Sequence, residues 1–130
     1  MTSNTLKLLR IFLVLIAIHS FCVGLGLVFI PLNLYELFGF HGYGGNFFKI
    51  QAGIFHIVMC LAYLWAALDP VRNMILIRFA ILAKMIATVF LISYAVFIDM
   101  IWTVMASGGL DFLMGLVLIW FHRRLKPVPA

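Results

Sequence analysis

The sequence predicts an all-α integral membrane protein, an antiparallel four-helix bundle of up-down topology. Of the 130 residues, 66% are apolar and only 10% are charged, and the mean hydropathy is +1.21. Soluble domains contain about 45 to 50% apolar and about 25% charged residues, so this chain has too few polar residues to cover a water-soluble surface. The apolar residues also gather in four segments of roughly the 20 residues that a helix needs to cross a bilayer. The same composition excludes a disordered chain, a disulfide scaffold and a nucleic-acid-binding protein.

The first span is expected at about residues 11–30, between the basic residues Lys7 and Arg10 and the helix-ending Pro31. An apolar run behind basic residues also describes a secretory signal peptide. This run is long and has no small-residue cleavage site, however, so we expect an uncleaved helix. The connection that follows is rich in glycine and aromatic residues, whose rings suit the polar edge of a membrane.

The remaining spans are expected at about residues 48–68, 75–97 and 102–121. The second span ends before Asp69-Pro70, because the residue that precedes a proline is disfavoured in a helix. The turn to the third span is short, and short connections join antiparallel neighbours. No repeat or second domain is visible, so residues 1–130 are predicted to form a single four-span domain.

The basic residues predict the orientation of the spans, since lysine and arginine accumulate on the cytoplasmic side of a membrane. Lys49 alone falls on or near one side, and all other basic residues fall on or toward the opposite side: Lys7, Arg10, Arg72, Arg78, Lys84, Arg123, Arg124 and Lys126. Both termini are therefore expected in the cytoplasm. The formal charge of +5 is then explained by attraction of the basic residues to the anionic headgroups of the lipid bilayer.

Several polar landmarks resemble those of the small four-helix DoxX-like membrane proteins. The landmarks are Pro31, Leu37-Phe38-Gly39, Lys49, Gly53, Tyr63-Leu-Trp-Ala-Ala-Leu-Asp69-Pro70, Arg72, Lys84 and Asp111-Phe-Leu-Met-Gly115. The likeness covers most of the chain. It implies a four-helix bundle in a bacterial inner membrane and, as in some relatives, a role as a subunit near quinone-linked oxidation. It carries no catalytic residues that can be transferred to this chain.

Four ionisable side chains fall near the middle of the spans, where a charge costs about 2.5 to 3.5 kcal/mol. They are His19, His56, Lys84 and Asp111. Helical spacing places each on a stripe with small or polar residues, and these stripes include Cys22, Cys60, Tyr63 and Tyr94. We therefore expect one polar core, lined by all four helices.

Lys84 and Asp111 form the most natural pair, because they lie at equal depth on helices joined by a tight hairpin. A buried ion pair that fixes the register of the two helices is the first interpretation. The alternatives are a proton relay or counter-ion for a polar ligand, and an unpaired Lys84 that reaches toward the membrane surface.

His19 and His56 allow three interpretations. Two imidazoles on adjacent helices are typical of b-type haem sites, although their estimated heights differ by about one helical turn. His19 with Cys22, and His56 with Met59 and Cys60, present nitrogen and sulfur ligands that suit copper(I). The favoured interpretation is that both are neutral histidines, hydrogen-bonded within the bundle.

Three functions follow from these features. The first, which we favour, is a non-catalytic or accessory subunit that meets other membrane subunits. The second is a redox or ligand-binding bundle that holds haem, quinone or a metal against His19 and His56. The third is a small transporter or channel, which would need a homo-oligomer because four helices enclose little volume. No nucleophile elbow, phosphate loop or two-histidine zinc motif occurs, so no catalytic residue is predicted.

Overall fold

The structure is a computed structural model and describes residues 3–125. These residues form four long helices, α1 (Ser3–Phe29), α2 (Asn46–Leu68), α3 (Met74–Phe97) and α4 (Trp102–His122), and a short 3₁₀ helix, η1 (Leu32–Phe38). No strand occurs within this range, so the prediction of an all-helical chain is confirmed there. All four long helices are long and apolar enough to cross a membrane.

The helix ends lie close to the expected spans, with one larger difference. α1 begins at Ser3 rather than near residue 11. Lys7 and Arg10 flank the apolar run, but both are good helix formers and do not interrupt the helix. Lys126, one of the basic residues that predict the orientation, lies outside the described residues.

The ends of η1 and α2 follow from local chemistry. Gly39 ends η1 with a φ of 90°, a conformation that glycine adopts without strain. Beyond α2, the Asp69 carboxylate accepts hydrogen bonds from the backbone N–H groups of Val71 and Arg72, at 3.2 and 3.1 Å. This side-chain-closed turn leads directly into α3.

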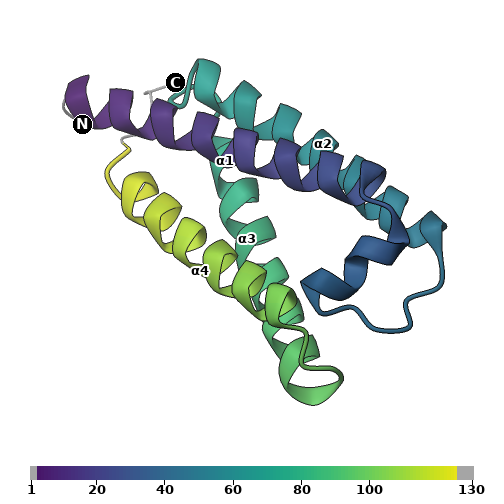
Figure 1. Ribbon diagram of the computed structural model, residues 1–130. Helices are drawn as coiled ribbons and strands as arrows, with labels where there is room; N and C mark the ends of the chain where they lie inside the picture. The colour runs from purple at the N-terminus through teal and green to yellow at the C-terminus, as the bar shows by residue number, and fades with distance from the viewer. Residues whose placement is uncertain (1–2, 126–130) are drawn as a thin grey trace.

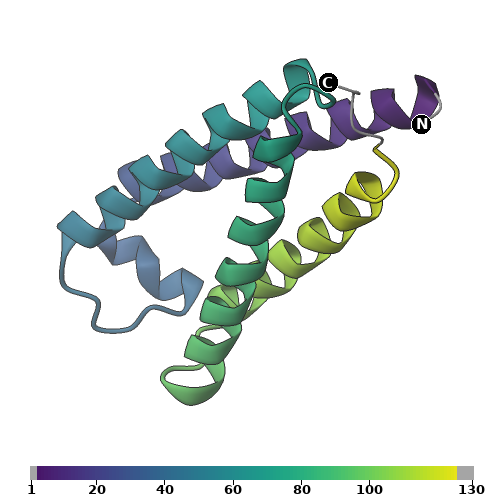
Figure 2. The same cartoon turned by 180° about the vertical axis from the view of Figure 1, so that it is seen from behind.

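The helices pack as two hairpins, α1 with α2 and α3 with α4 (Figure 1). The hairpins meet at the end that holds the two ends of the described chain and the turn between α2 and α3, and they spread apart toward the other end (Figures 1 and 2). Side chains from all four helices form an apolar core at the meeting end, with its most deeply buried members Leu9, Leu13, Ile16, Ile77 and Leu118.

At the open end, the connection between α1 and α2 reaches across to the second hairpin. The Thr103 hydroxyl of α4 donates a hydrogen bond of 2.5 Å to the backbone oxygen of Phe38. Gly39 packs on the same helix end, where an added β-carbon would lie 3.0 Å from the Trp102 ring. η1 therefore ties the two hairpins together where their helices diverge.

Candidate functional site

The polar side chains at mid-helix separate into two groups, one in each hairpin. In the second hairpin, Lys84 of α3 and Asp111 of α4 form a buried ion pair between the lysine Nζ and a carboxylate oxygen. Lys84 is 4% and Asp111 is 8% exposed, so the pair is nearly closed to its surroundings. The centre of the Tyr63 ring, on α2, lies 5.8 Å from Lys84 Nζ. The first hairpin therefore also contacts this ammonium group.

Small residues beside the ion pair let α3 and α4 approach closely. A β-carbon added to Gly115 would lie 2.8 Å from Met85 Sδ, and one added to Gly108 would lie 2.9 Å from an Ile92 side-chain carbon. Thr88 is buried one turn beyond Lys84, and its hydroxyl donates a 2.8 Å hydrogen bond to the Lys84 backbone oxygen. The charges are thus held in a tightly packed helix interface.

In the first hairpin, Ser20 links the two histidine-bearing helices. Its hydroxyl donates a 2.9 Å hydrogen bond to the backbone oxygen of His56 and lies 3.3 Å from His56 Nδ1. His19, the neighbour of Ser20 on α1, is partly buried, and its Nδ1 is enclosed without a hydrogen-bond partner among the described residues. The contact between α1 and α2 therefore runs through Ser20 rather than through a pair of histidines.

His19 and His56 lie close to a tight crossing of α1 and α2. The backbones of α1 and α2 touch one turn away, since a β-carbon on Gly24 would lie 2.8 Å from the Gly53 oxygen and 3.3 Å from His56 Cβ. A β-carbon on Gly53 would meet the Gly24 oxygen at the same distance. A porphyrin held by two axial imidazoles would lie between α1 and α2, whose backbones are in contact at this crossing. The geometry therefore does not favour haem here.

The predicted sulfur ligands do not come together either. Cys22 is exposed whereas Cys60 is buried, so the two cysteines do not share an interior. Within residues 3–125, no three His, Cys, Asp or Glu side chains gather in a way that would hold a metal ion.

The structure corrects the expected inner face of α1. The sequence placed His19 and Cys22 on that face, but the buried residues of the helix are Leu9, Leu13, Ile16, Ala17, Ser20 and Gly24. Small residues mark the contact with α2, as they commonly do where helices approach closely. Ser20 and Gly24 were not predicted, because the inner face of the helix was assigned from the ionisable His19. The face that is buried in the structure is rotated from the predicted one around the helix axis.

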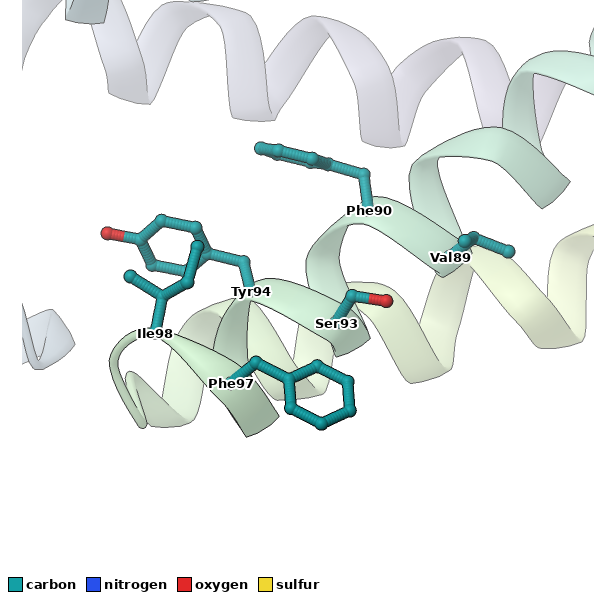
Figure 3. Close-up of a pocket in the computed structure, with 6 residues that line it drawn as sticks. All are labelled: Val89, Phe90, Ser93, Tyr94, Phe97 and Ile98. Carbon is teal, nitrogen blue, oxygen red and sulfur yellow. The ribbon is translucent and has the colours of Figure 1, made fainter.

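Tyr94 is the second predicted core residue that lies elsewhere. It lines a shallow, largely apolar hollow on α3 together with Val89, Phe90, Ser93, Phe97 and Ile98 (Figure 3). Its ring packs against that of Phe90, with 6.2 Å between the ring centres, within the range of about 4.5 to 7 Å that is usual for aromatic pairs. Tyr94 therefore takes no part in the group around Lys84 and Asp111. Cys60 and Tyr63, by contrast, lie in the buried core.

A further polar contact, which was not predicted from the sequence, organises the connection between α1 and α2. Lys49 of α2 is only 5% exposed, and its Nζ donates a 2.6 Å hydrogen bond to the backbone oxygen of Ile30 at the end of α1. The same ammonium lies 5.2 Å from the centre of the Tyr35 ring. Burial and, to a lesser extent, the nearby Tyr43 raise the pKa of the Tyr35 phenol above its ordinary value. A cation at the carboxyl end of a helix also interacts favourably with its dipole.

No family model, curated protein or solved structure matches this chain.

Proposed function

We propose that the chain is a small integral membrane protein of a bacterial inner membrane, with both termini in the cytoplasm. Its role is that of a non-catalytic, accessory subunit in a larger membrane complex. The resemblance to DoxX-like proteins adds that this complex is respiratory or redox-linked.

The surface of the helices supports the membrane location. Large apolar side chains are exposed along all four long helices, among them Phe29, Phe55, Trp65, Phe97 and Leu113. An apolar surface of this extent is unfavourable in water and is covered in a bilayer by lipid chains or by neighbouring helices.

The observation that carries the accessory role is the use made of the mid-helix charges. Lys84 and Asp111 neutralise each other inside one hairpin, in a closely packed helix interface. A buried pair of this kind fixes the register of two helices, which is a structural task. The outward apolar faces are then the part of the molecule left to meet other subunits.

Purification at native expression level tests this role. A chromosomally tagged protein, extracted in a mild detergent, is expected to elute with at least one other membrane protein in a constant ratio. Extraction from cells that carry the same tag on an unrelated four-span protein gives the background. Elution of the protein by itself, in several mild detergents, would contradict the accessory role.

A further inference from the structure

Arg78 and His122 form a polar contact outside the group around Lys84. Arg78 lies in the second turn of α3, and His122 is the last residue of α4. The guanidinium Nε of Arg78 donates a 3.0 Å hydrogen bond to His122 Nε2. Because a guanidinium stays protonated, Nε2 must be the acceptor, and the neutral imidazole then carries its own proton on Nδ1.

Within the described residues, no oxygen atom accepts a hydrogen bond from the Arg78 guanidinium. The other hydrogen bond recorded for its guanidinium runs from Nη2 to Met74 Sδ at 3.8 Å, and a thioether is a weak acceptor. Within residues 3–125, the carboxylates found in ion pairs are Asp69, with Arg72, and Asp111, with Lys84. Arg78 therefore has no carboxylate partner in the described part of the chain.

The surroundings of the pair are basic. Arg123 and Arg124 follow His122 directly, and the Arg124 guanidinium lies 3.9 Å from the centre of the Trp120 ring. Asp69, the acidic residue of the turn before α3, is engaged by Arg72 and by the backbone of its own turn. The end of the α3–α4 hairpin thus presents a positive field with a guanidinium held in one orientation by His122.

We propose that Arg78 binds a phosphate group at this end of the α3–α4 hairpin, with His122 as the residue that positions its guanidinium. The planar fork of an arginine matches the oxygens of a phosphate, and the pair offers donors without a competing carboxylate. The ligand is either the phosphodiester of an anionic lipid headgroup or free phosphate. Basic sites between helices at the cytoplasmic surface suit such headgroups. The lipid form rests on the membrane location proposed above, and neither form depends on the accessory role.

Native mass spectrometry of the purified full-length protein tests the lipid form, with phosphatidylglycerol and phosphatidylcholine as probes. A general surface charge contributes about 1 kcal/mol, equivalent to about a fivefold change in affinity. A charge-assisted hydrogen bond contributes more, so Arg78→Gln is expected to weaken phosphatidylglycerol binding at least about tenfold. Arg10→Gln, a matched loss of an exposed arginine on α1, is expected to weaken it no more than about fivefold.

A second measurement on the unaltered protein covers the free anion and does not depend on the folding of a variant. The ring signals of His122 in a nitrogen-15 NMR spectrum are expected to move on addition of either phosphatidylglycerol or inorganic phosphate. Movement with the lipid alone assigns a headgroup site, and saturable movement with millimolar phosphate assigns a soluble-anion site. Unmoved His122 signals with both probes would overturn the proposal. Equal losses in Arg78→Gln and Arg10→Gln would also overturn it, because they would show diffuse attraction rather than a site.

Discussion

Replacement of Lys84 by methionine is expected to destabilise the α3–α4 hairpin strongly. Methionine keeps most of the volume and removes the charge, so Asp111 remains as a buried carboxylate without its partner. Asp111 is 8% exposed, so little solvent reaches it. Breaking a buried pair from one side costs about 3 to 5 kcal/mol, and we expect a loss of that size in the free energy of unfolding.

Reversible unfolding in mixed micelles, followed by circular dichroism as the fraction of dodecyl sulfate rises, measures this loss. The double variant Lys84→Met/Asp111→Leu removes both charges and is expected to be at least as stable as Lys84→Met alone, because no charge is stranded. Lys7→Met, on the exposed start of α1, is the matched control and should change stability by no more than about 0.5 kcal/mol. A Lys84→Met protein as stable as the control would contradict this role of the ion pair. So would a double variant whose loss equals the sum of the losses measured for Lys84→Met and Asp111→Leu alone.

Three other predictions concern the first hairpin and its connection. Gly24→Ala is expected to cost about 1 to 3 kcal/mol, because its β-carbon would meet the Gly53 oxygen at 2.8 Å, whereas Gly109→Ala, with nothing within 4 Å, should be neutral or slightly stabilising in the same unfolding assay. Lys49→Met removes a charged hydrogen bond to Ile30, so we expect the free energy of unfolding to fall by about 1.5 to 3 kcal/mol. Proteolytic cleavage within residues 31–45 should also become faster. An unchanged cleavage rate would argue against this role of Lys49. The pKa of Tyr35 is raised in the folded chain. The contribution of this shift to the free energy of unfolding is therefore fully present below the ordinary tyrosine pKa of about 10, and it is lost as the pH rises through the raised value. Ultraviolet titration should therefore show a late-ionising phenol that is missing from Tyr35→Phe, and identical curves for the two proteins would refute it.

The helices were predictable from sequence because hydropathy and length suffice to find them. The pairing of Lys84 with Asp111 was also accessible, since equal depth on two helices joined by a short turn leaves few other partners. Both features depend on local pattern and on neighbours in the chain.

The face of α1 was not predictable in the same way. Its side chains are apolar on almost every side, so the inner face could be assigned only from the few polar or small residues. His19 and Cys22 indicated the wrong face, whereas Ser20 and Gly24 lie on the buried one. The spread of the two hairpins and the docking of η1 on α4 depend on contacts such as that between Thr103 and Phe38, which join residues far apart in the sequence. The connection has no periodicity from which such a contact could be inferred.

Site-directed labelling tests the four-span arrangement most directly. In a chain with Cys22 and Cys60 replaced by alanine, single cysteines at Ser3, Gly44 and Asp99 are exposed to a membrane-impermeant maleimide in intact spheroplasts and in inverted vesicles. Gly44→Cys and Asp99→Cys are expected to react in spheroplasts, and Ser3→Cys only in inverted vesicles. Reaction of all three positions from one side, or recovery of the protein without membranes, would contradict the account.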